Sequence, residues 1–172
     1  TIAKLKDHST DYRVLSKEYE CLSSMSTNAL QCGQAIRNIY IDNTDAMALV
    51  NLKTARDNLL EIKKTLSAEY PQEYAKFNAE FDAYLSNTNA IIDSFEGTHT
   101  LDRASVTENT KVWRELKDII GVEIKTIDSI RIGLNERFLG FLDDANRIIF
   151  SFGLITIVIT FMALLGFYFS IM

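Results

Sequence analysis

Residues 148–172 read IIFSFGLITIVITFMALLGFYFSIM, a stretch without one charged side chain. A helix of this length rises about 37 Å, enough to cross a bilayer core of about 30 Å with some tilt. Its hydroxyl side chains can bond to the helix's own carbonyls. The alternative, a buried helix in a soluble core, is disfavoured because the rest of the chain could not cover it. We predict a transmembrane helix, and its C-terminal position excludes a cleaved signal peptide.

The preceding residues 1–147 are enough for one domain with its own hydrophobic core. They contain the only proline, Pro71, and few glycines, and residues such as Ala, Leu, Glu and Lys dominate. This composition predicts long helices rather than a sheet. The formal net charge of −5 argues against nucleic acid as a partner. We expect a helical domain over residues 1–147 and a membrane span over residues 148–172.

Residues 1–41 carry the alternating three–four spacing that marks the seam of a helical bundle. One set of positions repeats every seven residues, and a second set is interleaved with it. The first set is Leu15, Leu22, Ala29 and Ile36, and the second is Tyr19, Ser26, Gly33 and Tyr40. This pattern predicts one long helix.

Turn signals separate two shorter helices from it. Residues 42–45, Asp-Asn-Thr-Asp, supply turn and N-cap chemistry, so we expect a second helix over about residues 45–67. Pro71 suits the first turn of a third helix that runs to about residue 95, and residues 96–100 form the next loop. The positions predicted to be buried are Ala48, Leu52, Ala55, Leu59, Ile62 and Leu66 in the second helix, and Tyr74, Phe77, Phe81, Tyr84, Thr88, Ile91 and Phe95 in the third.

The fourth helix should begin near residues 101–103. Its heptad positions are occupied by apolar residues without exception: Val106, Trp113, Ile120, Ile127, Leu134 and Phe141. Nothing in the sequence breaks the helix before Arg147, so we expect it to continue into the membrane span. The predicted fold is all-α, an antiparallel up-down-up-down four-helix bundle whose last helix enters the bilayer.

The helix lengths predict an uneven bundle. The first helix and the extramembrane part of the fourth are each about 60–66 Å long, whereas the middle helices are each about 35 Å. The middle helices can therefore cover only the half far from the membrane, and Thr1 should return to the membrane surface, after an earlier span. A thin stalk of two helices needs a second copy to bury its apolar seam, so we expect a parallel homodimer.

The two cysteines, Cys21 and Cys32, would lie about 16 Å apart along one helix, too far for an intramolecular disulfide. They are expected to be two small buried hydrophobic residues, with a disulfide between parallel subunits as the alternative. The sequence has no CxxC pattern, which gives zinc and covalently attached haem no support. His8 and His99 have no catalytic partner at a telling spacing, and no phosphate-binding loop exists. We predict no cofactor, no metal and no enzymatic activity.

Residues 29–42 read ALQCGQAIRNIYID. This run, within an extramembrane bundle next to a membrane span, resembles the end of the first helix in the sensor domains of bacterial methyl-accepting chemotaxis proteins. The resemblance covers the whole chain in architecture and about fifteen residues in local sequence. It implies a homodimer, a preceding membrane span, a cytoplasmic HAMP linker and a signalling module after Met172. It also implies a bundle on the extracytoplasmic, periplasmic side of the inner membrane. The same kind of sensor bundle also occurs on histidine kinases and nucleotide cyclases.

Related receptors bind small ligands between helices in the membrane-distal half, often through arginines. Arg37 is the strongest candidate here, because its guanidinium near the distal end could hold a carboxylate in a bidentate way. At the same height on the fourth helix, two cations and two hydroxyls could converge with it, while Gln34 and Tyr40 would complete the site. An organic acid or an amino acid is the expected ligand, and the candidate residues are Arg37, Gln34, Tyr40, Thr107, Thr110, Lys111 and Arg114.

Structural explanations stand beside these candidates. Arg37 could instead pair with Asp42, Glu108 or a helix carbonyl, and Lys111 and Arg114 could be solvated surface charges. Trp113 is expected in the core, and Arg56 on the surface. Two further polar residues of the fourth helix, Asn109 and Glu123, could set helix register rather than bind a ligand.

Two other functions compete with the receptor interpretation. A tail-anchored fusion protein of the syntaxin kind also has three helices, a long heptad helix and a C-terminal span. That family places Gln or Arg in the middle of the last helix's core, whereas Ile120 and Ile127 stand at that point here. A purely structural dimeric stalk without a ligand is the remaining alternative.

Overall fold

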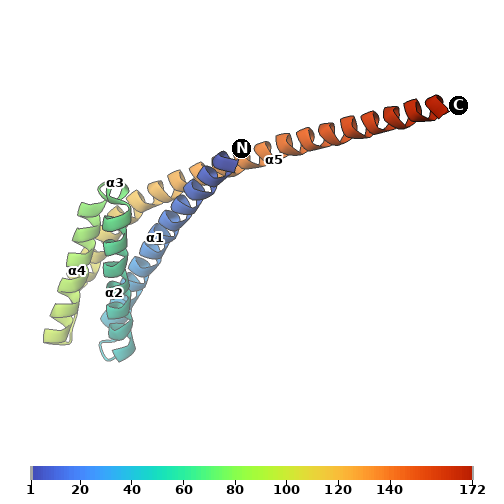
Figure 1. Ribbon diagram of the computed structural model, residues 1–172. Helices are drawn as coiled ribbons and strands as arrows, with labels where there is room; N and C mark the ends of the chain where they lie inside the picture. Colours follow the sequence, from blue (N-terminus) through green and yellow to red (C-terminus); the bar gives the residue numbers. More distant parts are fainter. Residues whose placement is uncertain (1, 172) are drawn as a thin grey trace.

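The computed structural model describes the backbone of residues 2–171 and the side chains of residues 10–167. The described chain is all-α, with four major helices packed together (Figure 1). In chain order the helices are α1 (Ile2–Ile41), α2 (Ala46–Glu69), α3 (Pro71–Tyr74), α4 (Asn78–Thr98) and α5 (Arg103–Ile171). The predicted fold class is therefore confirmed, and Thr1 lies outside the described residues.

The α1–α2 turn and the α4–α5 loop lie together at one end of the bundle, which we call the distal end. The Asp45 carboxylate caps α2 by accepting a hydrogen bond from the Ala48 N–H at 3.0 Å. His99 ends α4 in the left-handed conformation, with φ of 56°. The Asn43 side-chain amide donates to the His99 carbonyl at 3.1 Å and ties the two connections together. The loop between α4 and α5 begins later than the predicted residue 96, because α4 extends through Thr98.

The third helix is not continuous, contrary to the prediction. It begins at Pro71 as expected but ends at Tyr74, and a turn precedes the start of α4 at Asn78. The turn keeps the Tyr74 and Phe77 rings in the core, in an edge-to-face contact with centroids 5.6 Å apart. It also lets Lys76 form an ion pair with Glu123 of α5 at 2.8 Å. Packing at this end of the core therefore overrides the helical tendency of the sequence.

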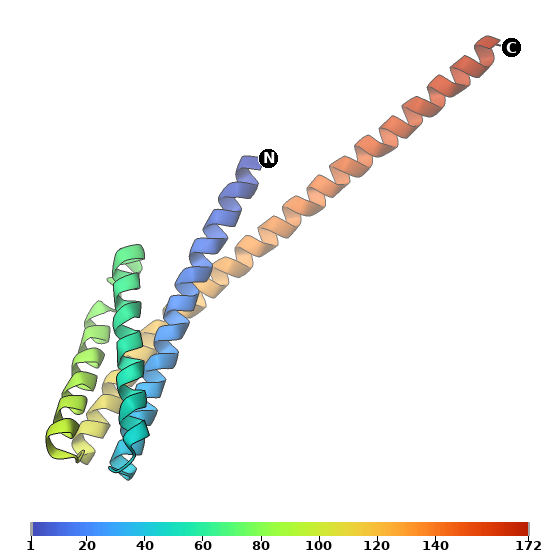
Figure 2. The ribbon, with the colours of Figure 1, turned by 60° about the horizontal axis from the view of Figure 1, so that its bottom comes forward.

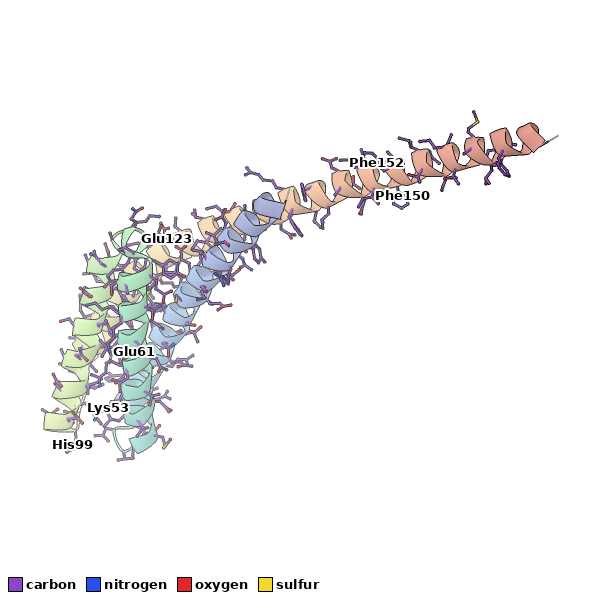
Figure 3. The ribbon with its side chains drawn as sticks, viewed as in Figure 1. Lys53, Glu61, His99, Glu123, Phe150 and Phe152 are labelled. Carbon is purple, nitrogen blue, oxygen red and sulfur yellow. The ribbon has the colours of Figure 1, made fainter. Side chains whose placement is uncertain are left out.

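The apolar faces of α2 and α4 form much of the core, as the sequence predicted. All seven positions expected to be buried in the third helix are buried, as are five of the six in the second, and Ile62 is half-buried. Exposed ion pairs between α2 and α4 flank this core: Lys53 with Glu96, and Lys63 with Asp82 at 2.6 Å. Figure 3 shows the Lys53 side chain on α2 near the distal end of the bundle.

The seam of α1 differs from the prediction in half of its positions. Leu22, Ala29 and Ile36 are buried and Leu15 is half-buried, which confirms the first heptad set. The second set is shifted by one residue, because the residues that face the core are Glu18, Met25, Cys32 and Ile39. The predicted second set lies at the edge of the seam, since Tyr19, Ser26 and Gly33 are half-buried and Tyr40 is exposed.

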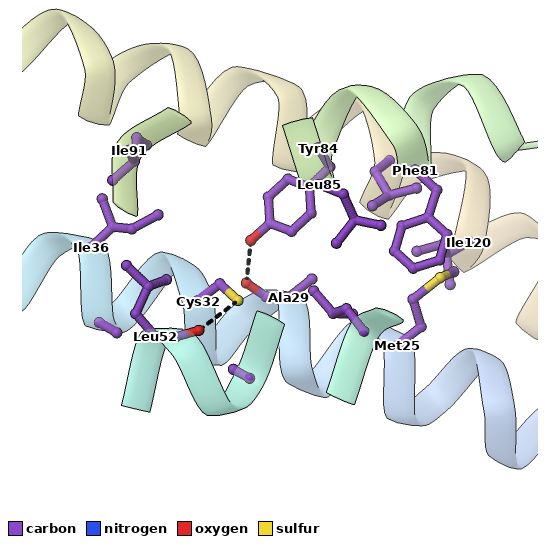
Figure 4. Packing of buried hydrophobic residues seen from close by; sticks show 14 of the residues in the cluster. Met25, Ala29, Cys32, Ile36, Leu52, Phe81, Tyr84, Leu85, Ile91 and Ile120 are labelled. Atoms are coloured by element: carbon purple, nitrogen blue, oxygen red, sulfur yellow. Dashed lines mark hydrogen bonds between the residues drawn. The ribbon is translucent and has the colours of Figure 1, made fainter. Parts of the chain in front are cut away.

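Hydrogen bonds cross this core at a few polar points (Figure 4). The buried Tyr84 hydroxyl donates to the Ala29 carbonyl of α1 at 2.7 Å. The Cys32 thiol lies 4.0 Å from the Leu52 carbonyl of α2, and the Tyr84 ring packs beside the Trp113 ring at 5.8 Å between centroids. Trp113 is half-buried and packs against the core, as predicted. These contacts fix the heights of α1, α2, α4 and α5 relative to one another.

Helix α5 runs without interruption for 69 residues, from the distal loop to Ile171. This continuity confirms that the fourth helix passes directly into the apolar segment. One 18-residue window has a mean hydropathy of 2.6 with none of it buried, so α5 is long and apolar enough to cross a membrane. Phe150 and Phe152 project freely from it (Figure 3), with 79% and 67% of their surface exposed.

The middle helices cover only part of α1 and α5, as the helix lengths predicted (Figure 1). Beyond them α1 and α5 stay in contact through Arg131, whose guanidinium lies over the Tyr12 and Tyr19 rings. Toward the N-terminus of α1 the two helices then diverge (Figure 2). The expected two-helix stalk is therefore paired near the bundle and open further along.

Candidate functional site

Four of the predicted site residues line one hollow on α5, which we call the α5 groove. Its volume is about 460 Å³, within the range typical of small-molecule sites. Every lining residue belongs to α5, within residues 106–118. The lining consists of Val106, Thr107, Thr110, Lys111, Arg114, Glu115 and Asp118.

The two threonines of the α5 groove are oriented by their own helix. The Thr107 hydroxyl donates to the Arg103 carbonyl at 2.8 Å, and the Thr110 hydroxyl donates to the Val106 carbonyl at 2.9 Å. Because each hydroxyl proton is used in this way, the oxygen can only accept a further hydrogen bond. The threonines therefore suit a donor on a ligand, such as an ammonium group, better than a carboxylate.

The charges of the α5 groove are mixed. Lys111 and Arg114 supply two cations, and Glu115 and Asp118 supply two carboxylates further along the same lining. Lys111 lies 3.7 Å from Glu108, a loose exposed ion pair that costs little to exchange for a ligand. A ligand that carries both a carboxylate and an ammonium would meet opposite charges at the two ends of the groove.

Arg37 does not line the α5 groove. Its side chain is exposed, and its Nε donates to the Gly33 carbonyl of α1 at 3.1 Å. Of the structural alternatives for Arg37, the helix carbonyl is therefore the partner found. Tyr40 is 44% exposed near the same end of α1 and also lies outside the groove lining.

Gln34 lines a different hollow, between α1 and α2, which we call the amide hollow. Its volume is about 320 Å³. The lining consists of Gln31, Gln34, Ala35, Asn38, Asn51, Thr54 and Ala55. The sequence-predicted residues thus separate into the α5 groove, the amide hollow and the exposed pair of Arg37 and Tyr40.

Three polar residues serve packing between helices. The Asn109 amide, 2% exposed, donates to the Asn87 side chain of α4 at 2.8 Å, which fits the predicted role in register. Glu123 pairs with Lys76. Arg56, expected to be a surface residue rather than a ligand contact, is half-buried, and its guanidinium donates to the Asn89 side chain of α4 at 2.8 Å. The long side chain of Arg56 thus reaches across to the neighbouring helix.

A buried carboxylate, Glu18, was missed in the sequence. It is 5% exposed at the α1 seam, close to Glu73, Lys76 and Glu123 from the α3 region and α5. Burial raises the pKa of Glu18, the carboxylates of Glu73 and Glu123 raise it further, and Lys76 lowers it. The signal was present, since Glu18 occupies the heptad position shared by Met25, Cys32 and Ile39.

The cysteines are both free thiols, with Cys32 fully buried and Cys21 half-buried. Burial raises the pKa of the Cys32 thiol to about 12 and also raises the pKa of Cys21. Within residues whose side chains are described, no group of three or more His, Cys, Asp or Glu side chains is arranged to hold a metal ion.

No protein-family model, no curated protein and no solved structure matches this chain. The resemblance to sensor domains of chemotaxis receptors therefore stays a prediction. The structure itself shows an all-helical bundle with a long apolar C-terminal helix.

Proposed function

We propose that this chain is the sensor region of a transmembrane receptor, with its bundle outside the cytoplasm and α5 as the signalling element. The single observation that carries the proposal is the continuity of α5 from the α5 groove to the apolar segment. A ligand that binds to one end of a rigid helix can bias the position of the other end. The resemblance of residues 29–42 to chemotaxis receptors supports the same interpretation and the periplasmic location at the inner membrane.

The ligand class follows from the α5 groove. Lys111 and Arg114 would bind a carboxylate, since charge-assisted hydrogen bonds to such groups are strong. The carboxylates of Glu115 and Asp118, next to the two cations on α5, would bind an ammonium. The acceptor oxygens of Thr107 and Thr110, on the other side of the cations, would accept hydrogen bonds from further donor groups of the ligand. An amino acid satisfies both halves of the groove, whereas a simple organic acid satisfies only the cationic half. We therefore favour an amino acid as the ligand.

The proposed receptor acts as a parallel homodimer. Helix α5 exposes large apolar side chains beyond the part covered by the middle helices, where water would otherwise meet them. They include Ile130, Ile132, Leu139 and Leu142. A furrow of about 620 Å³, lined by α5 residues from Val122 to Arg137, runs along this part of the helix. A second copy packed in parallel would cover these side chains.

The test is a thermal stability screen of the full chain in lipid nanodiscs, read by the fluorescence of Trp113, the only tryptophan. The ligands are the twenty amino acids with succinate, malate and citrate. A ligand that binds only the folded bundle raises the melting temperature as its concentration exceeds the dissociation constant. We expect an amino acid to do so, and we expect Lys111→Ala and Arg114→Ala to abolish the shift.

Lys117→Ala is the matched control, because Lys117 is an exposed cation of α5 that does not line the α5 groove. It should leave the shift unchanged. If the folded chain shows no shift with any of these compounds, the α5 groove is not an amino-acid or organic-acid site. A ligand-free stalk would then be the better account.

A further inference from the structure

The amide hollow between α1 and α2 has a lining without any charged side chain. Three of its polar residues, Gln31, Gln34 and Asn38, come from one face of α1, and Asn51 and Thr54 come from α2. Four of these five side chains are carboxamides, each able to donate and to accept hydrogen bonds. The lining therefore differs in kind from that of the α5 groove, where every polar function is an ion or a hydroxyl.

The hollow exists because small residues lie at its floor. Ala35 of α1 and Ala55 of α2 are 4% and 1% exposed, so two short buried side chains lie beneath the longer polar ones. The polar side chains stand on either side of this floor and leave about 320 Å³ between them. That volume is near the lower end of the range of about 300–1,000 Å³ found for small-molecule sites.

The next layer of the same α1–α2 groove is closed by an amide pair. There the Asn58 side-chain amide donates to the Asn28 side chain at 3.0 Å. The carboxamides of Gln31, Gln34, Asn38 and Asn51 make no such bond to any residue whose side chain is described. The Thr54 hydroxyl donates to the Val50 carbonyl at 2.9 Å, which leaves its oxygen free to accept. The Asn28 and Asn58 side chains thus bond directly to each other across α1 and α2. One turn further along, the carboxamides of the amide hollow remain available to bond to a ligand.

We propose that the amide hollow is a second ligand site, which binds a small uncharged polyol such as a sugar or a sugar alcohol. Adjacent hydroxyl groups each donate and accept hydrogen bonds, which matches the paired donor and acceptor of each carboxamide. A carboxylate or ammonium ligand would meet no opposite charge in the lining and would therefore gain no charge-assisted hydrogen bond there. The site is separate from the α5 groove and does not depend on the proposed amino-acid ligand.

The experiment uses the full chain in nanodiscs and three probes, myo-inositol, D-ribose and D-glucose, with succinate as the charged comparison. Binding is measured by isothermal titration and by the shifts of side-chain NH₂ resonances, assigned with single variants. A ligand of about 12 heavy atoms in an open site should bind with a dissociation constant of about 1 mM. We expect at least one polyol to bind, to shift the Gln34 and Asn51 NH₂ signals, and not to be displaced by succinate.

Gln34→Leu and Asn51→Leu remove the carboxamides at exposed positions, where the bundle should tolerate the change. Each should weaken polyol binding about 10-fold or more. Gln72→Leu is the matched control and should leave polyol binding unchanged, because Gln72 is an exposed amide on α3 outside the lining of the hollow. Lys111→Ala and Arg114→Ala should also leave it unchanged, which separates this proposal from the proposed function. Failure of all three polyols to bind at about 20 mM, or binding that survives both leucine substitutions in the hollow, would overturn it.

Discussion

The guanidinium carbon of Arg131 on α5 lies 4.8 Å from the centre of the Tyr19 ring on α1. The same guanidinium lies 5.5 Å from the Tyr12 ring and donates to the Tyr12 hydroxyl at 3.4 Å. This contact stands about two turns of α5 beyond the Lys76–Glu123 ion pair, where the α3 region ends. Arg131 therefore holds α1 and α5 together at the point where the four-helix bundle becomes a pair of helices.

The cation–π contact should be measurable as a coupling energy. In a double-mutant cycle, Arg131→Ala and Tyr19→Leu should couple by about 0.5–1 kcal/mol, the size found for cation–π contacts that are not fully desolvated. The measurement is denaturant unfolding of the bundle in nanodiscs, followed by Trp113 fluorescence. Arg131→Ala combined with Tyr40→Leu is the control and should be additive, because Tyr40 lies near the distal end. Zero coupling in the first cycle would show that the contact contributes nothing to stability.

The two cysteines should differ strongly in reactivity. Cys32 is fully buried and its thiol has a pKa of about 12, so almost no thiolate is present or reachable at pH 8. Cys21 is half-buried, so we expect a maleimide to modify Cys21 at least about 100-fold faster than Cys32. Mass spectrometry of timed samples from the Cys21→Ser and Cys32→Ser variants gives the two rates. Similar rates in the folded protein would contradict the packing of Cys32 between α1 and α2.

Glu18 should make the stability of the bundle depend on pH. Because burial raises its pKa in the folded state above the ordinary value of 4.5, the folded state binds the proton more tightly than the unfolded state does. The contribution of Glu18 to the free energy of unfolding is therefore fully present below pH 4.5. It is lost as the pH rises through the folded-state pKa. Glu18→Gln should therefore raise the free energy of unfolding at pH 7.5 by about 1 kcal/mol and have much less effect near pH 4.

The matched control for this pH effect is Glu20→Gln, an exposed carboxylate on the same helix. It should change the stability little at either pH. A Glu18→Gln variant that is less stable than the wild-type protein at pH 7.5 would mean that the charged carboxylate is well solvated or paired. The difference would be read from the same unfolding measurement.

The fold was largely predictable because the heptad spacing of apolar residues fixes which helix faces meet. The core faces of α2 and α4 and the unbroken α5 followed directly from that spacing. The second heptad set of α1 was predicted one residue too late. The aromatic residues Tyr19 and Tyr40 were assigned to the buried face, but they lie at its edge. The break after Tyr74 had no glycine or proline to announce it, since it arises from packing of Phe77 and pairing of Lys76.

The candidate site was less predictable than the fold. Spacing on one helix sufficed to group Lys111, Arg114 and the two threonines, because residues three and four apart share a face. The position of Arg37 relative to these residues depends on which face α1 turns toward the core. That face was predicted incorrectly for the second heptad set, so the position of Arg37 could not be predicted. The amide hollow is lined by residues of both α1 and α2, and no pattern on a single helix shows which residues of its neighbour lie opposite.

If α5 carries the signal as a rigid rod, a proline in the middle should uncouple its two ends. Ile130→Pro removes a backbone hydrogen bond and kinks the helix beyond the bundle, at a position that is 46% exposed. The variant should still show the ligand-induced rise in melting temperature. The ligand should no longer displace the part of α5 that leads into the apolar segment. Ile130→Ala is the control and should retain both. Displacement that persists in the proline variant would rule out α5 as the rigid connection.

The most direct measurement is the distance between spin labels on Arg13 of α1 and Glu136 of α5, both exposed, in nanodiscs without and with the amino acid selected by the stability screen. The labels are introduced by cysteine substitution in a Cys21→Ser, Cys32→Ser background and diluted with unlabelled chain. The account predicts that saturating ligand shifts the distance distribution by about 1–2 Å, the usual size of such helix displacements. It also predicts that Arg114→Ala abolishes the shift. Superimposable distributions at saturating ligand would contradict transmission through α5.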